Sequence, residues 1–69
     1  MVWIITENTD AKNEFISCVF SRQQADAIIN TLLSSDKLFS SGHRIYMIQP
    51  VEENNGGFPH YLPEEIFYS

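Results

Sequence analysis

"SRQQADAIINTLLSS", residues 21–35, carries the clearest structural pattern in the chain. Ser21 is followed three residues later by Gln24, which is the spacing of a helix capping box. Phe20 and Ala25 stand at the two positions of a hydrophobic staple, which fixes the direction in which a chain enters a helix. The stretch therefore predicts a helix that begins at Ser21.

The apolar residues of this stretch share one helical face. They recur at the i, i+3, i+4 and i+7 positions, while the residues between them are mostly polar. We expect a helix of about 13 residues that ends near Ser34 or Ser35 and buries one side. The positions on that side are Ala25, Ile28, Ile29 and Leu32, widened by Leu33.

Three segments around the helix have the composition of strands. Residues 1–6, "MVWIIT", and 14–20, "EFISCVF", are rich in β-branched and aromatic residues, and the polar stretch between them predicts a hairpin. Residues 44–52, "RIYMIQPVE", form the third strand, with Pro50 at its end or on an edge because proline lacks a backbone donor. Residues 35–43 are expected to form a loop with one short turn near Leu38 and Phe39, punctuated by Gly42.

This order of elements predicts an α+β fold of the form β-β-α-β. A right-handed crossover from the second strand through the helix makes the third strand parallel to the second. The third strand then pairs with the first, which gives a three-stranded antiparallel sheet in the order 2-1-3 with the helix on one face. We expect a single domain over residues 1–69, with a core at 1–51 and an acidic, aromatic tail at 52–69.

The tail combines acids, rings, prolines and glycines. Residues 54–57, "NNGG", predict a turn, and Pro63 followed by two glutamates resembles the first turn of a helix. The opposite face of the sheet is also largely apolar and needs a cover. The tail either folds over that face or docks on a partner.

Composition limits the classes of function. The chain of 69 residues has one cysteine, so it forms no intrachain disulfide, and such a small domain needs a tight core or a partner that shares it. Residues 1–44 hold four cations and five acids, a net of −1, whereas residues 45–69 hold four acids and no Lys or Arg, a net of −4. This asymmetry favours a basic protein partner and disfavours direct binding to nucleic acid or to an anionic membrane. With no membrane span and no signal-peptide core, we expect a cytoplasmic protein.

Catalysis is not expected. His43 and His60 stand seventeen residues apart and no cysteine is beside either, so no metal site is predicted, and no motif indicates a cofactor. Neither histidine has the spacing of a catalytic triad. Cys18 lies within a strand between apolar residues, where we expect a buried, unreactive thiol.

The string "VWIIT…FISCVFSRQQADAII" resembles the opening of small bacterial domains of unknown function. Their pattern is a short strand, a second strand that ends in Val-Phe-Ser, and a helix with an early alanine. Such domains commonly lie near toxin–immunity or phage-defence genes, so the resemblance implies a role of that type. It assigns no functional residues.

These observations favour a small acidic inhibitory binding protein. The expected partner is basic, either a nuclease-like toxin neutralised by an immunity protein or a host enzyme inhibited by a phage-type protein. The alternative is a non-catalytic homodimeric interaction or assembly module whose tail completes the core of a homodimer. The expected partner-binding residues are Glu52, Glu53, Phe58, Tyr61, Glu64, Glu65 and Phe67.

Overall fold

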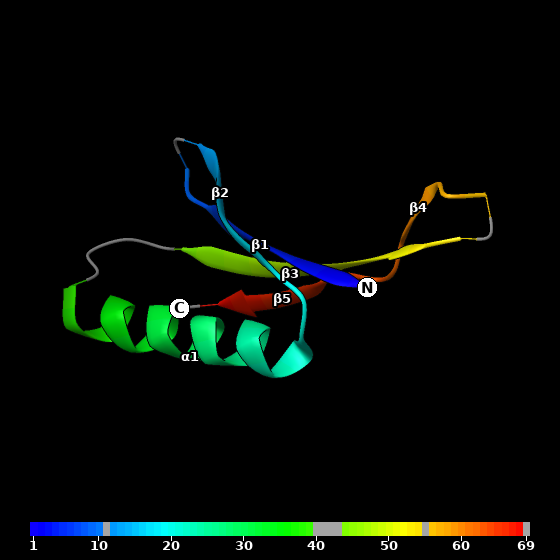
Figure 1. Ribbon diagram of the computed structural model, residues 1–69. Coiled ribbons are helices and arrows are strands. Elements are labelled where there is room, and N and C mark those ends of the chain that lie inside the picture. Colours follow the sequence, from blue (N-terminus) through cyan, green and yellow to red (C-terminus); the bar gives the residue numbers. More distant parts are fainter. Residues whose placement is uncertain (11, 40–43, 55, 69) are drawn as a thin grey trace.

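The computed structural model describes residues 1–10, 12–39, 44–54 and 56–68, with the backbone alone at 36–39. Over these residues one helix packs against one face of an antiparallel sheet of five strands (Figure 1). The α+β class is therefore confirmed. The elements are β1 (Val2–Asn8), β2 (Asn13–Val19), α1 (Arg22–Phe39), β3 (Ile45–Glu53), β4 (Pro59–Tyr61) and β5 (Glu65–Tyr68). No helix in this part of the chain has both the length and the hydrophobicity needed to cross a bilayer.

The sheet contains the predicted order of strands and extends it. β1 lies between β2 and β3, as expected from the right-handed crossover. The prediction of only three strands is wrong, because β4 and β5 both pair with the other edge of β3. Unpaired backbone groups along that edge need hydrogen-bond partners, and the C-terminal residues supply them.

The C-terminal residues thus extend the sheet at its edge and do not fold across its face. The helical first turn predicted at Pro63 is also wrong, since residues 65–68 form β5. Glu65 and Phe67 alternate with Ile66 and Tyr68, and a strand sends alternate residues to opposite faces of a sheet. Pro63 and the two glutamates are typical of a helix start, but a helix of four residues is unstable. The alternation of β5 therefore decides the structure of this segment.

Pro50 occupies the sixth position of β3, a strand that continues past it and is paired along both edges, so the expectation of a strand end or an edge strand is wrong. Its carbonyl oxygen accepts a hydrogen bond of 3.0 Å from the Leu62 amide, between the segments of β3 that pair with β4 and β5. The nitrogen and oxygen of an extended residue point to the same edge. The nitrogen of Pro50, which carries no hydrogen, therefore faces the gap between β4 and β5. No hydrogen bond between strands is lost there.

The helix starts as predicted and runs further. The Ser21 hydroxyl accepts a hydrogen bond of 3.1 Å from the Gln24 amide, which confirms the cap. Phe20 is 76% exposed, so it does not pack as a staple. α1 has 18 residues and includes 36–39, which were expected in a loop; Gly42 lies outside the described residues. Because the sequence has no Gly or Pro between Ser21 and Gly42, nothing stops the helix near Ser35.

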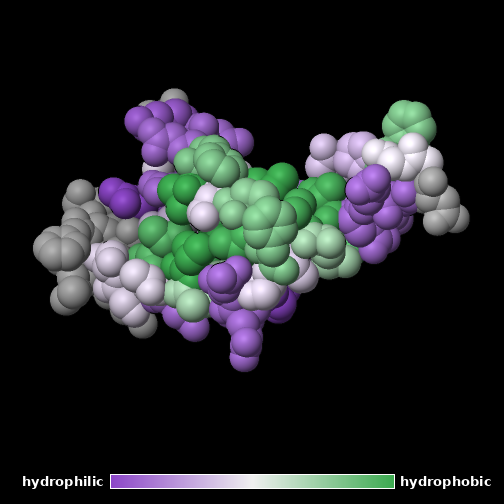
Figure 2. Space-filling model, in the orientation of Figure 1, coloured by the Kyte–Doolittle hydropathy of each residue, from purple (hydrophilic) through white to green (hydrophobic). Residues whose placement is uncertain are grey.

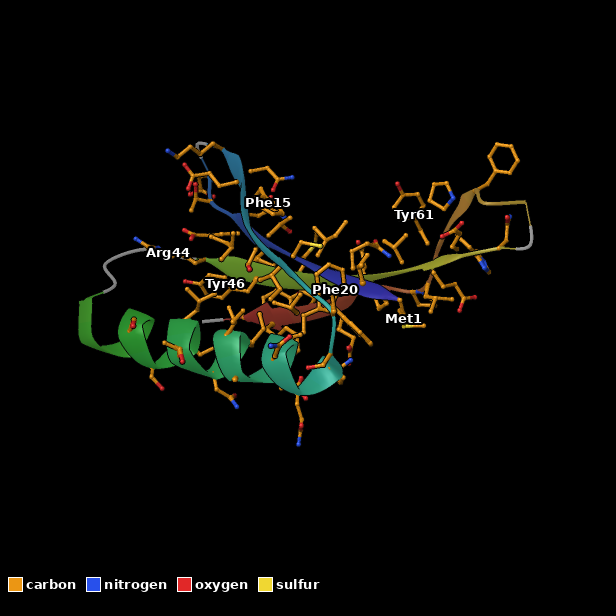
Figure 3. All side chains as sticks on the ribbon, viewed as in Figure 1. Met1, Phe15, Phe20, Arg44, Tyr46 and Tyr61 are labelled. Atoms are coloured by element: carbon orange, nitrogen blue, oxygen red, sulfur yellow. The ribbon has the colours of Figure 1, made fainter. Side chains whose placement is uncertain are left out.

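The core lies between the sheet and the predicted face of the helix. Ile5 and Ile48 are directly opposite each other in the β1–β3 ladder and are fully buried. Ala25 and Ile29 cover them from α1, and Tyr46 lies between the sheet and the helix (Figure 3). Half-buried residues surround these five: Trp3, Ile16, Val19, Ile28, Leu32, Leu33 and Phe67. Figure 2 shows the hydrophobic residues gathered over the middle of the molecule, with hydrophilic residues mainly around them.

The other side of the sheet, which we call the open face, is not covered by any helix or strand of the described residues. Cys18, paired with Ile4 across the β1–β2 ladder, points to this side and is exposed, so the prediction of a buried thiol is wrong. Phe15, on the same side, is 66% exposed. By strand alternation the open face carries the apolar or small residues Val2, Ile4, Thr6, Phe15, Cys18, Ile45, Met47, Val51, Ile66 and Tyr68, together with the uncharged polar residues Asn8, Asn13 and Gln49.

The core geometry predicts that Ile29 is more important than Ile28 for stability. Ile29 is 2% exposed, whereas Ile28 is half-buried. Ile29→Ala should lower the free energy of unfolding by about 2–5 kcal/mol, because it removes buried methyl groups and leaves a cavity. Ile28→Ala should cost less. Urea unfolding followed by circular dichroism measures both, and equal losses for the two variants would contradict this placement of the core.

Candidate functional site

The end of β3 and β4 form a hairpin that projects beyond the part of the sheet covered by the helix (Figure 1). At its turn, the Asn54 amide donates to the Phe58 carbonyl and the Gly57 amide donates to the Asn54 carbonyl, each at 3.0 Å. Gly57 has a φ of 79°, in the region that side chains disfavour. The turn predicted from "NNGG" is therefore confirmed, and its backbone needs glycine at this position.

A side chain also holds the turn. The Asn54 Oδ1 atom accepts hydrogen bonds from the amides of Gly56 at 2.9 Å and Phe58 at 3.0 Å. Asparagine is common in turns because its side chain bonds backbone groups a few residues further along. The hairpin therefore presents Phe58 from a fixed backbone.

The hairpin brings together four of the seven expected binding residues. Phe58 is 68% exposed at the tip, and Tyr61 is 61% exposed on β4 (Figure 3). Glu53 is exposed and Glu52 is half-buried on β3. His60 lies opposite Glu52 in the ladder, with its Nδ1 atom 3.2 Å from the Glu52 Oε1 atom. Two carboxylates and two rings thus share one projecting element.

The remaining three expected residues lie elsewhere. Glu64 is exposed on the link between β4 and β5. Phe67 packs against the core, and Glu65 forms an ion pair with Arg22 at the start of the helix. The sequence places these residues close together along the chain, but the strand β5 turns two of them toward the helix.

The pair of Glu65 and Arg22 joins β5 to α1. Arg22 also donates from Nε to Asp26 Oδ1 at 3.0 Å. The hydrogen bond from Arg22 lowers the pKa of Glu65, and the hydrogen bond to Glu65 raises the pKa of Arg22. Both side chains remain more than 40% exposed, so solvent screens the interaction. We assign Glu65 a structural role.

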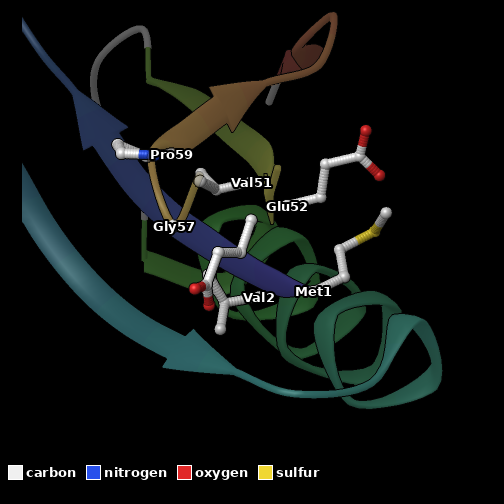
Figure 4. A pocket seen from close by; sticks show the side chains of 7 residues that line it. Met1, Val2, Val51, Glu52, Gly57 and Pro59 are labelled. Carbon is white, nitrogen blue, oxygen red and sulfur yellow. The ribbon is translucent and has the colours of Figure 1, made fainter. Parts of the chain in front are cut away.

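A pocket of 280 Å³ lies at the base of the hairpin (Figure 4). Met1 and Val2 line one side, and β3 with β4 lines the other, including Glu52, Glu53 and Pro59. The contribution of the N-terminus was missed from the sequence. The antiparallel pairing of the first and third strands places Val2 opposite Val51. That pairing, which the sequence predicts, could have placed the N-terminus beside the hairpin.

The arrangement is suited to binding. In residues 1–10, 12–39, 44–54 and 56–68, no three His, Cys, Asp or Glu side chains gather into a metal site. The hairpin carboxylates can accept hydrogen bonds from Lys or Arg side chains, and the neighbouring rings can bury apolar area. His43 lies outside the described residues.

The Glu65–Arg22 pair predicts a small, pH-dependent contribution to stability. Because the folded-state pKa of Glu65 is lowered, the contribution is present above the unfolded pKa and disappears as the pH falls through the folded pKa. Glu65→Gln should therefore lower the unfolding free energy at neutral pH by at most about 1 kcal/mol. The gap between variant and wild type should close in acid. Urea titrations over a pH series measure this, and a gap that persists below the folded pKa would contradict the assignment.

Comparisons of this chain with family models, with curated proteins and with solved structures found no match.

Proposed function

We propose that this protein is a small non-catalytic inhibitor that binds a basic protein partner through its β3–β4 hairpin. The observation that carries the proposal is the projection of two carboxylates and two exposed rings on one turn-stabilised element. We name Glu52, Glu53, Phe58 and Tyr61 the hairpin surface. The partner is best matched by a nuclease-like toxin or by a host enzyme with a basic active site.

Charge supports the choice of a basic partner. Residues 45–69 contain four acids and no Lys or Arg, so no lysine or arginine lies near in sequence to offset Glu52 and Glu53. An acidic surface steers a basic partner during the diffusional approach and accelerates association. A partner with an anionic surface would be repelled by the same groups.

Shape supports inhibition. A hairpin that projects from the body can enter a concave site, whereas the covered side of the sheet cannot. Phe58 stands at the tip, and Tyr61 stands on β4 near its base. Exposed aromatic rings that become buried at the centre of an interface supply much of its binding energy. Carboxylates would steer the hairpin to a basic cleft, and the rings would hold it there.

Affinity purification tests this proposal. Tagged wild-type protein and the double variant Glu52→Lys/Glu53→Lys are used to capture proteins from cells of the source organism, and quantitative mass spectrometry compares them. We expect a basic protein that the wild type retains and the double variant loses. A reading frame beside the gene that encodes a basic toxin-like domain identifies the first candidate to co-express.

Kinetics with the captured protein then separate steering from anchoring. Charge reversal at Glu52 and Glu53 should slow association and weaken its salt dependence, whereas Phe58→Ala should mainly accelerate dissociation. Glu64→Lys is the matched control, because it makes the same charge change outside the hairpin surface. Equal effects of all charge reversals, or a captured protein that is acidic, would contradict the proposal.

A further inference from the structure

The open face of the sheet has an unusual distribution of charge. In β1, β2, β5 and residues 45–51 of β3, the alternate positions on this side contain no Asp, Glu, Lys or Arg. The charged residues of the same strands, Glu7, Glu14 and Glu65, all lie on the side that faces the helix. A sheet with one side in water ordinarily places polar residues on that side. Here the uncovered side is the uncharged one.

Large apolar side chains on this face remain in contact with solvent. Phe15, Ile66 and Tyr68 are 66%, 45% and 72% exposed, and they stand on strands at opposite edges of the sheet. Ile4 and Met47 lie between them on the central strands. Contiguous apolar patches of this kind are typical of interfaces between proteins.

We propose that the open face is a homodimer interface, on which a second copy of this chain packs its own open face. The inference is separate from the hairpin function. A dimer of this form would stack helix, sheet, sheet and helix, and each copy would give the other the second apolar layer that a two-sided sheet requires.

Charge favours a second copy as the occupant. Each chain carries a formal charge of −5, so two copies can associate only through a surface that keeps their acids apart. The open face meets this condition, and an uncharged apolar surface is complementary to itself, as the two-fold symmetry of a dimer requires. A basic partner would instead gain little from β1, β2, β5 and residues 45–51 of β3, because on this side they present no carboxylate with which to pair.

The size of the face can be compared with that of known interfaces. A standard interface covers about 800 Å² per partner, which is about a sixth of the 4922 Å² surface of this chain. The open face is one of the two broad sides of a two-layer molecule. Thr6, whose cross-strand neighbours are Phe15 and Met47, already buries its hydroxyl oxygen, so covering the face removes no water from that group.

Pairing through strand edges is less suitable. β2 forms one edge of the sheet, and its ladder with β1 has an irregularity between Ile5 and Thr6. Bulges of this kind twist an edge away from a second sheet. The other edge consists of β4 and β5, which have three and four residues. Short edge strands give few hydrogen bonds to an incoming strand, so the face is the better surface for association.

Sedimentation velocity over a concentration series from low micromolar to several hundred micromolar tests the dimer. We expect the wild type to shift from monomer to dimer as concentration rises. Ile66→Glu and Phe15→Glu should each raise the dimer Kd about tenfold or more, because each would bury a carboxylate in an apolar interface. Phe58→Glu makes the same aromatic-to-acid change as Phe15→Glu at an equally exposed site on the hairpin, and should leave the Kd unchanged. Circular dichroism of each variant shows whether the fold is retained.

Cys18 gives an independent readout because it lies on the open face. Its reaction with a maleimide should slow as wild-type protein passes from monomer to dimer, and should not depend on concentration in Ile66→Glu. A chain that stays monomeric at every concentration would overturn the proposal. So would a dimer insensitive to both open-face substitutions, or a monomer whose basic partner is lost on Ile66→Glu. None of these outcomes tests the hairpin variants, so the two proposals fail separately.

Discussion

The contact between Ile5 and Ile48, closed from the helix by Ala25 and Ile29, is the centre on which the structure depends. It joins the two central strands and fixes which side of the sheet faces the helix. Because a strand alternates its side chains strictly, burial of Ile5 also sets the positions of Ile4 and Thr6 on the opposite side. The single helix covers one side only, so the open face follows directly from the choice of this core.

β3 has a second organising role, because it is paired along both edges. β1 uses one edge, while β4 and β5 divide the other at Pro50. This division separates the C-terminal residues into two groups. Residues near β4 belong to the projecting hairpin, and residues of β5 return to the core and to Arg22. The acidic, aromatic segment therefore supplies packing and an ion pair in β5, and in the hairpin it supplies the surface that we propose for binding.

The two candidate surfaces differ in physical character. The hairpin surface is charged and projects, so it favours fast association that depends on salt. The open face is largely apolar and, over residues 2–8, 13–19, 45–51 and 65–68, uncharged, so it favours burial of apolar area with little dependence on salt. In a dimer formed through the open face, Phe58 and the turn at Asn54 would stay exposed at the end of each sheet. Such a dimer would present two hairpins to partners.

The sequence by itself determined the elements with strong local patterns. The helix from Ser21, the order of the first three strands and the turn at residues 54–57 were all predicted, because capping, hydrophobic periodicity and turn chemistry act over a few residues. Only the tertiary structure decided the positions of Cys18, Glu65 and Phe67. Their environment depends on which side of a strand faces the helix and on which edge of β3 is free, and both are set by pairing between residues distant in sequence.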